Sequence, residues 1–444
     1  MSDVTTTKGS VPAKKDASGI REAGLSRRGL LKGAAAVAGL AAGSGALTGF
    51  PTIWAQNIKN VTLRQFGTGV SNQNAIAEKV KEDLGFNLEL TALDSDAVAQ
   101  RAVTQPQSYD IADIEYWICK KVFPSGVMQP MDVSKIKNYD KIAKLFITGK
   151  LTPESVIAQG TAPHTVGFVE GEDSTTFADA PTGWMTMIPT IYNADTLGIR
   201  PDLTKEVSSW GDLLDPAYKG KASILNIPSI GIMDAAMVSE ALGEVSYADK
   251  GNMTKEEIDK TIALMIKAKK DGQFRAFWKS FDESVNLMAS GEVVIQSMWS
   301  PAVAAVRSKG IPCKYQPLKE GYRAWGGGIG MAKHLTGLER DAAYEYLNWY
   351  LSGWVGAYLL RQGYYSACPT TAKEFMTADE WGYWMDGKPA EGEIKAPDGK
   401  VMEEPGAIRD GGSFLERMGR VACWNSVMDE NKYMIRKWNE FIAA

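Results

Sequence analysis

The residues best placed to do chemistry in this sequence stand where predicted β-strands end. In an open α/β sheet, a ligand binds in the crevice outside the carboxyl ends of the strands. A tight turn, an acidic residue and three tryptophans occupy those positions, so we expect a ligand site built from distant parts of the chain. The four strand ends carry Gly67-Thr68-Gly69, Glu115-Tyr116-Trp117, Trp299-Ser300 and Trp325-Gly326-Gly327.

The first of these strand ends, the segment GTGVS at 67–71, stands directly before a predicted helix. Backbone N–H groups at the start of a helix attract anions. Thr68 and its neighbours are therefore candidates to bind a carboxylate. A plain connecting turn is the alternative interpretation, just as a tryptophan at a strand end can belong to the core.

No pattern of residues indicates catalysis. A nucleophile such as Cys119 or Ser300 needs a base, and the only histidines, His164 and His334, are far apart in the sequence. The glycines of 326–330 follow a predicted strand, but their spacing is not that of a dinucleotide-binding loop. The sequence therefore predicts a protein that is not an enzyme and has no metal or other cofactor.

The four cysteines are widely spaced and form no CxxC pair, which argues against a metal cluster. In an oxidising compartment they could form up to two disulfides, in three possible pairings. Buried free thiols are the alternative interpretation. The residues concerned are Cys119, Cys313, Cys368 and Cys423.

Alternating strand and helix patterns position the strand ends. In the first part of the chain, strands are predicted at 61–66, 86–93 and 109–115. The segment at 72–85 between the first two has apolar residues at helical spacing, with a glycine at its end. Strand-helix alternation with short links predicts an α/β domain with a largely parallel sheet.

A second α/β block begins at residue 208. It contains an amphipathic helix at 254–272, which Thr254 and Glu257 begin as a capping box. Strand character returns at 322–333, and a further helix follows at 338–352. The Gly- and Pro-rich stretch 386–412 is expected to be an exposed excursion.

The chain begins with the features of an export signal. Residues 33–50 carry no charge, follow a basic segment, and precede a plausible cleavage site at Ala55. The segment SRRGLLK at 26–32 resembles the twin-arginine signal, which sends folded proteins out of the bacterial cytoplasm. A membrane anchor is the alternative, but the uncharged segment is short and rich in Ala and Gly. We therefore predict a signal peptide at 1–55 and a periplasmic protein.

The charge of the remaining chain excludes some partners. Residues 1–55 carry seven Lys and Arg against three Asp and Glu, which leaves 42 basic and 50 acidic residues, a net charge of −8. A chain with this charge is not suited to nucleic acid or to an anionic membrane surface. We expect a small molecule as its ligand.

The order of segments between 208 and 370 resembles one family. The segments are SWGDLLDPAYKGK, MASGEVVIQSMWSPAVAAVRSKGIP, YRAWGGGIGMAK, AAYEYLNWYLS and GYYSACP, with YDIADIEYWICKKVFPSGVMQPMDVSKIKN (109–138) in the first half. Together they resemble the periplasmic spermidine/putrescine-binding family of ABC importer receptors, which are extracellular solute-binding proteins. The resemblance covers most of the chain after the signal.

The resemblance implies an α/β fold of the type II periplasmic binding protein class. Two discontinuous lobes would be joined by hinge crossings, with the ligand between them. By analogy, lobe one takes 57–185 and 327–375, and lobe two takes 186–326 and 376–444. The family would make the chain a monomer that delivers its solute to an ABC permease in the inner membrane.

The resemblance also assigns residues to the pocket. Trp299 and Trp325 align with pocket tryptophans, Trp117 lies near the position of a pocket tyrosine, and Glu115 aligns with a small polar contact. Tyr365 is expected in the pocket wall. Aromatic rings of this kind bind organic cations through cation–π and apolar contacts.

Most of the family's ammonium-binding carboxylates have no counterpart in this chain. Gly327 stands where the family has an acidic residue, and 226–229 replaces an acidic pair. Glu115 is the remaining candidate anchor. We therefore expect a smaller or singly charged organic solute rather than spermidine or putrescine, such as an amino-acid derivative or a quaternary amine. A zwitterion would use both Glu115 and the turn at Thr68.

Two other functions are compatible with the sequence. An exported oxidoreductase or hydrolase without a recognisable cofactor motif would explain export in a folded state. A receptor that senses a solute and contacts a signalling partner would look the same in sequence as a transport receptor.

Overall fold

The computed structural model describes residues 58–444. The predicted signal peptide, 1–55, lies outside the described residues. Within the described part, no helix combines the length and the apolar character needed to cross a membrane.

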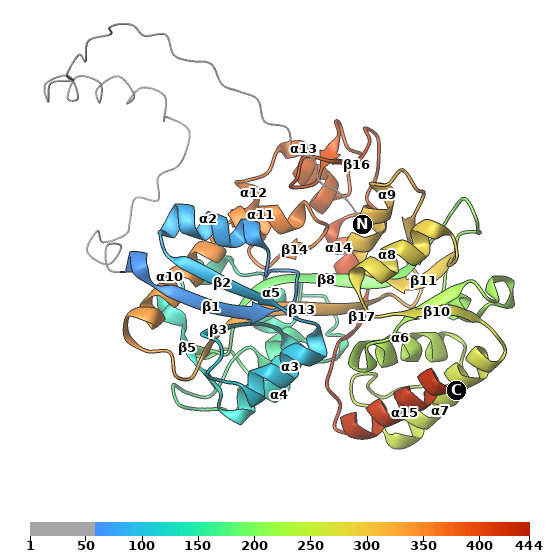
Figure 1. Cartoon of the computed structure of the whole chain (residues 1–444), viewed down its shortest axis with the longest axis horizontal. Coiled ribbons are helices and arrows are strands. Elements are labelled where there is room, and N and C mark those ends of the chain that lie inside the picture. The colour runs from blue at the N-terminus through green and yellow to red at the C-terminus, as the bar shows by residue number, and fades with distance from the viewer. Residues whose placement is uncertain (1–57) are drawn as a thin grey trace, which may run out of the picture. The chain divides into compact units, whose positions relative to one another are not determined.

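One large twisted sheet extends across the described structure, in the strand order β10-β9-β11-β8-β13-β3-β1-β2. At one end, β1 (Thr62–Gly67) pairs in parallel with both β2 (Asn87–Ala92) and β3 (Ile111–Glu115). Figure 1 shows these strands in blue and cyan, with helices on both sides. We call this part the first lobe, and its pairing confirms the predicted parallel α/β arrangement.

The other end of the sheet forms the second lobe. Here β9 (Ala222–Leu225) pairs in parallel with β10 (Phe274–Trp278) and β11 (Ile295–Met298). Two long strands, β8 (Ile188–Ile199) and β13 (Tyr322–Ala332), lie between the lobes and pair with each other antiparallel. They are the crossings between the lobes, so the predicted two-lobed α/β fold is confirmed.

Helices cover the sheet in each lobe (Figure 1). The first lobe is discontinuous, because it takes α10 from beyond the second lobe. Its helices are α2 (Asn74–Leu84), α3 (Ser95–Thr104), α4 (Tyr116–Val122) and α10 (Gly337–Tyr350). The second lobe has α6 (Pro228–Ala241), α7 (Lys255–Lys270), α8 (Phe281–Ser290), α9 (Ser300–Arg307) and α15 (Asn431–Ala443).

The helix α7 illustrates why the local sequence forms these elements. The Thr254 hydroxyl accepts a hydrogen bond from the Glu257 N–H, and the Glu257 carboxylate accepts one from the Thr254 N–H. This capping box satisfies two backbone donors at the helix start. Ile258, Ile262 and Met265 recur on one face and are buried. The helix predicted at 254–272 is thereby confirmed.

The chain from 354 to 424 adds a series of short elements to the sheet, in which β14 pairs with β8 and β17 pairs with β13. Figure 1 shows most of these elements above the sheet. The stretch 386–412 is only partly exposed. It contains a two-stranded antiparallel hairpin, and Ala390, Ile394 and Arg409 are buried. The expectation of an exposed excursion is wrong for those residues. The elements are α11 (Trp354–Leu360), β14 (Tyr365–Ser366), α12 (Pro369–Lys373), α13 (Ala378–Trp381), the π-helix η8 (Gly382–Asp386), β15 (Ile394–Lys395), β16 (Val401–Glu403), α14 (Phe414–Met418) and β17 (Val421–Trp424).

The described residues form two apolar cores, and the larger one includes residues of both lobes, such as Phe66 and Trp278. The stretch predicted to complete lobe two is divided between them, since Tyr383 and Trp384 pack with one core while Met434 and Trp438 pack with the other. The predicted lobe limits remain a prediction. All four cysteines are buried free thiols, so the disulfide alternative does not hold in this structure.

Candidate functional site

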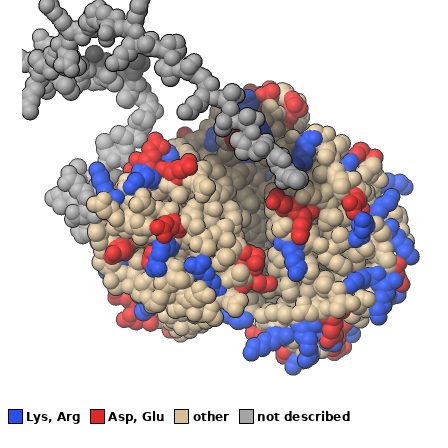
Figure 2. Space-filling model, in the orientation of Figure 1, with Lys and Arg blue, Asp and Glu red and all other residues tan. Residues whose placement is uncertain are grey.

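A cavity of about 550 Å³ lies between the lobes and is lined by residues of both. Figure 2 shows the surface hollowed at this place. The first lobe contributes the ends of β1 and β3 and the start of α3, and the second lobe contributes residues around α6, α8 and α9. The two crossing strands form its floor through Asp195, Arg323 and Trp325. The volume suits one small organic molecule.

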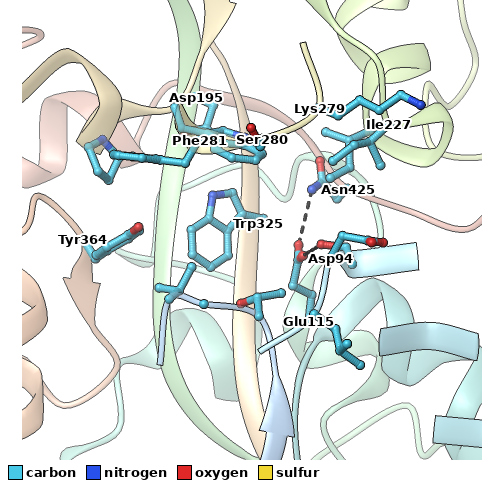
Figure 3. Close-up of a pocket in the computed structure, with 18 of the residues that line it drawn as sticks. Asp94, Glu115, Asp195, Ile227, Lys279, Ser280, Phe281, Trp325, Tyr364 and Asn425 are labelled. Atoms are coloured by element: carbon cyan, nitrogen blue, oxygen red, sulfur yellow. Dashed lines mark hydrogen bonds between the residues drawn. The ribbon is translucent and has the colours of Figure 1, made fainter. Parts of the chain in front are cut away.

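Aromatic rings enter the cavity from three directions. Trp325 projects from β13 and meets the edge of Tyr364, with ring centroids 5.9 Å apart (Figure 3). Trp299 stands at the N-cap of α9, held edge-to-face against the buried Trp278 at 4.8 Å. Phe281 at the start of α8 is 37% exposed. The predicted pocket residues Trp299 and Trp325 thus both line the cavity.

Glu115 also lines the cavity, at the end of β3. Its Oε1 accepts a hydrogen bond from the Ser95 hydroxyl at 2.9 Å, and its Oε2 accepts one from the Asn425 amide at 3.5 Å (Figure 3). Burial raises the pKa of Glu115, against the opposing effect of these donors. The Trp117 indole donates a further bond at 2.6 Å. A carboxylate accepts about four bonds, so one direction remains for a ligand.

Trp117 does not reach the cavity. The helix α4 begins at Tyr116, and the Trp117 ring is 2% exposed within the core of the first lobe. Its contribution to the site is the indole N–H that fixes the Glu115 carboxylate. Trp117 therefore holds the Glu115 carboxylate in position and does not itself line the cavity.

Gly327 and Tyr365 lie outside the cavity lining as well. Gly327 pairs with Glu115 across β13 and β3, and a Cβ on it would lie 3.3 Å from the Thr190 hydroxyl, within the sheet. Tyr365 is fully buried against Tyr192. Because successive residues of an extended segment point to opposite sides, Tyr364 faces the cavity instead.

The turn at Thr68 lies in the cavity wall together with Gly69 and Val70. The Thr68 carbonyl accepts hydrogen bonds from the backbone and side chain of Asn72. The N-cap of α2, Gln73, makes no side-chain capping bond, so the first N–H groups of that helix have no side-chain cap. The anion-binding role of this turn remains a prediction, for which the N–H groups at the start of α2 are the candidate donors.

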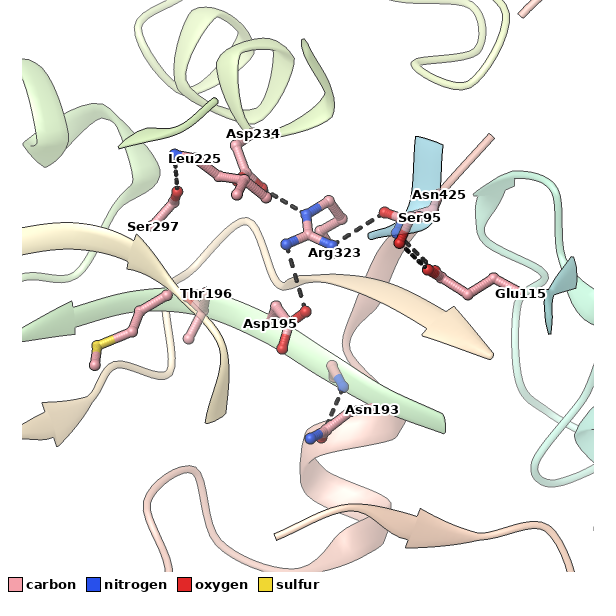
Figure 4. A network of polar contacts seen from close by, with 12 residues as sticks. Ser95, Glu115, Asn193, Asp195, Thr196, Leu225, Asp234, Ser297, Arg323 and Asn425 are labelled. Atoms are coloured by element: carbon pink, nitrogen blue, oxygen red, sulfur yellow. Dashed lines mark hydrogen bonds and ion pairs between the residues drawn. The ribbon is translucent and has the colours of Figure 1, made fainter. Parts of the chain in front are cut away.

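A buried ion cluster forms the floor, and sequence reasoning missed it. Arg323 donates to Asp234 at 2.6 Å and to Asn425 at 3.0 Å, and Asp195 lies 3.4 Å away (Figure 4). Arg323 and Asp195 stand opposite each other in the register of β13 and β8. The signal in the sequence was a single charged residue within each of two otherwise uncharged strands.

The cluster carries an excess of negative charge. Asp195, Asp234 and Glu115 surround the single guanidinium of Arg323, and Asn425 joins Glu115 to it. Asp195 and Asp234 are each 1% exposed or less, and of the two only Asp195 lines the cavity. The Asp195 Oδ2 makes no hydrogen bond among the described residues, and the Arg323 guanidinium lies 3.4 Å from it. A cavity floor of this kind is electrostatically complementary to a cation.

Comparisons with known proteins identify the family and the fold. The family model described as "Bacterial extracellular solute-binding protein" matches residues 75–388, more than half of the chain. A comparison with curated protein sequences gave no match.

Solved structures of similar fold include three whose descriptions state a solute. A putative spermidine/putrescine ABC transporter from Listeria monocytogenes is 14% identical with a TM-score of 0.60, covering 86% of this chain and 98% of that one. The Atu4243-GABA receptor is 16% identical with a TM-score of 0.52, covering 86% and 97%. The protein AgtB from A. tumefaciens R10, in complex with agropinic acid, is 14% identical with a TM-score of 0.52, covering 86% and 99%. At these identities the likeness establishes the fold.

Proposed function

Because the chain belongs to the bacterial extracellular solute-binding proteins, the substrate-binding components of ABC transporters, we propose that it captures an organic solute with a cationic nitrogen. The solute would be polyamine-like, amino-acid-derived or a quaternary amine. The observation that carries this proposal is the combination of aromatic walls and a floor with more carboxylates than cations. Each ring over a cation contributes about 0.5–2 kcal/mol.

A zwitterion would find partners at two places in the cavity. Its ammonium group would lie against Trp299 and Trp325, near the carboxylates of Glu115 and Asp195. Its carboxylate would lie at the Thr68 turn and the uncapped start of α2. Glu115→Gln and Thr68→Ala would then each weaken binding. If neither changes the affinity, the solute does not bind as a zwitterion at these two places.

Thermal unfolding against a panel of solutes tests the proposed ligand class. The panel contains polyamines, betaines, amino acids, opines, sugars and carboxylates. A solute at 100 times its dissociation constant adds about 2.7 kcal/mol to the free energy of unfolding. We expect a shift from amines or zwitterions. A shift from sugars or simple carboxylates alone would contradict the proposal, and turnover of a solute would favour the enzyme alternative.

Closure of the lobes is expected to be favoured by the hydrogen bond between Ser229 and Asp96. The Ser229 hydroxyl at the start of α6 donates to the Asp96 carboxylate of α3 at 3.2 Å. Such a bond contributes about 1 kcal/mol, so Ser229→Ala is expected to weaken solute affinity about fivefold. Calorimetry measures the affinity, and small-angle scattering measures the share of open protein. In a double-mutant cycle with Asp96→Ala, additive effects would show that the bond does not act in closure.

Solute affinity is expected to fall as the pH is lowered below about 6. Burial raises the pKa of Asp195 to about 6, against the opposing charge of Arg323. A proton and a cationic solute compete for this carboxylate, so affinity falls by at most tenfold per pH unit below that value. Titrations at pH 5 and 7 measure the change. Asp195→Asn should remove most of it, and an unchanged pH dependence would exclude Asp195 as a ligand contact.

The stability of the protein without solute is expected to change with pH in the opposite direction to the solute affinity. The pKa of Asp195 is higher in the folded than in the unfolded chain, so the folded state keeps this proton longer. The contribution of this group to the free energy of unfolding therefore rises as the pH falls from about 6 to 4.

We also propose that residues 1–55 direct twin-arginine export and that the exported protein is a periplasmic monomer. The pair Arg27-Arg28 before an uncharged segment supports the route. Replacing both arginines with lysine is expected to leave the precursor in the cytoplasm, as cell fractionation would show. Continued export of the variant would contradict the route. Light scattering of the purified protein tests the monomer.

A further inference from the structure

A second, much smaller cavity lies apart from the solute site. Its volume is about 30 Å³, enough for a single small ion or a water molecule. It is found where α9 meets the chain between β16 and α14. Three arginines and two acidic residues line it: Arg307, Arg409, Arg417, Glu403 and Asp410.

The charges around this small cavity do not balance. Arg307 engages both acidic residues, with Glu403 at 2.6 Å and Asp410 as its second partner. Arg409 and Arg417 have no ion pair with a carboxylate among residues 58–444. Arg409 donates to the carbonyls of Trp384 and Gly363, and Arg417 donates to those of Asp410 and Ala194. One positive charge is therefore left over.

The two guanidinium groups without a carboxylate partner share one aromatic neighbour and are buried. Arg409 and Arg417 are 4% and 1% exposed. Both lie against the ring of Tyr365, with their central carbons 4.5 and 5.9 Å from its centroid. Burial lowers the pKa of Arg409 to about 10, and the charge of Arg417 adds to the decrease. The pKa of Arg417 is raised, because the surrounding tyrosines and Asp410 outweigh its burial. The less compensated charge is therefore that of Arg409, and a buried charge of this kind is stabilised by a negative partner.

Hydrogen-bond donors without partners surround the same place. The Arg417 Nε, the Trp384 indole N–H and the Tyr365 hydroxyl are buried, and none has a hydrogen-bond partner among the described residues. Arg417 and Trp384 both line the small cavity. Guanidinium and indole N–H groups can only donate, so they require an acceptor. A buried set of unused donors favours an anion over a metal cation.

We propose that the small cavity binds one monovalent anion of halide size, such as chloride, between Arg409 and Arg417. The volume excludes a solute of the kind proposed for the main cavity. The site adjoins the crossing strand β8 through the Ala194 carbonyl and adjoins Tyr364 of the main cavity through Gly363. A bound anion would therefore stabilise the chain that supports the solute site.

The first test compares thermal unfolding in sodium chloride and in sodium gluconate at equal ionic strength. Gluconate is too large for the cavity, so chloride is expected to raise the melting temperature by roughly 2 °C more. Trp384→Phe, which keeps a ring but removes one donor, is expected to reduce this difference. Trp381→Phe, on neighbouring α13 and outside the cavity, should keep it. Equal melting temperatures in both salts would overturn the proposal.

The second test does not depend on the folding of any variant. Crystals of the unaltered protein grown with sodium bromide are measured at the bromine absorption edge. An anomalous peak between Arg409 and Arg417 is expected. A cavity that shows only water-like density, with bromide elsewhere on the surface or nowhere, would overturn the proposal.

Discussion

Replacing Arg323 with methionine is expected to lower the free energy of unfolding by about 3–5 kcal/mol. The change removes the only guanidinium within the ion cluster and leaves Asp195 and Asp234 buried beside each other. Their charges would lack a partner, and burial already raises the pKa of both. Denaturant unfolding at pH 7 measures the loss.

A matched control separates this effect from the loss of any surface ion pair. Arg275 pairs with Glu292 at 2.6 Å, and both side chains are about half exposed. Arg275→Met should therefore cost less than about 1 kcal/mol. The loss in Arg323→Met should also shrink at pH 5, because protonation neutralises the two aspartates. Equal losses in the two variants, independent of pH, would refute the role assigned to Arg323.

Trp325→Leu is expected to weaken solute binding by about 10- to 100-fold. Leucine keeps an apolar side chain on β13 but removes the ring that projects into the centre of the cavity (Figure 3). Trp299→Leu should act in the same direction, since Trp299 lines the same cavity from the second lobe. Calorimetry with the solute identified in the thermal panel measures both.

Trp354→Leu provides the control for these variants. Trp354 also has an aromatic neighbour, Tyr358, with ring centroids 5.2 Å apart, but it lies outside the cavity. Its replacement should leave the solute affinity unchanged. It should lower the free energy of unfolding by about as much as Trp325→Leu does. Unchanged affinity in Trp325→Leu would mean that the solute binds elsewhere.

The sequence was most informative where local pattern alone decides structure. Alternating strands and helices predicted the two α/β blocks, and residues at strand ends predicted Thr68, Glu115 and Trp299 as neighbours. Strand ends converge in any sheet of this kind, so no tertiary detail was needed for these three. Trp325 was also expected at a strand end, but it lies within β13, and it was the family resemblance that assigned it to the pocket. The helix at 254–272 followed from its capping box and apolar spacing.

The remaining site residues depend on pairings that no local pattern contains. Arg323 meets Asp195 only through the register of β13 and β8, and it meets Asp234 only through the packing of α6. Tyr364 and Tyr365 are adjacent and point to opposite sides of the extended segment. An error of one residue in the predicted position therefore assigns the core residue to the cavity. Trp117 was correctly predicted to lie next to Glu115, but its ring is buried in the core instead of facing the cavity, because α4 begins one residue before it.

The amide of Asn425 has a consequence for how such a receptor can diverge. It accepts from Arg323 and donates to Glu115, so it joins the ion pairs of the floor to the carboxylate at the end of β3. A mutation that reverses the charge at one of these positions leaves the others unsatisfied. Changes of ligand charge during evolution would therefore require coordinated substitutions. Among relatives, the residues at 115, 195, 234, 323 and 425 should covary as a group, whereas the aromatic walls can change one at a time.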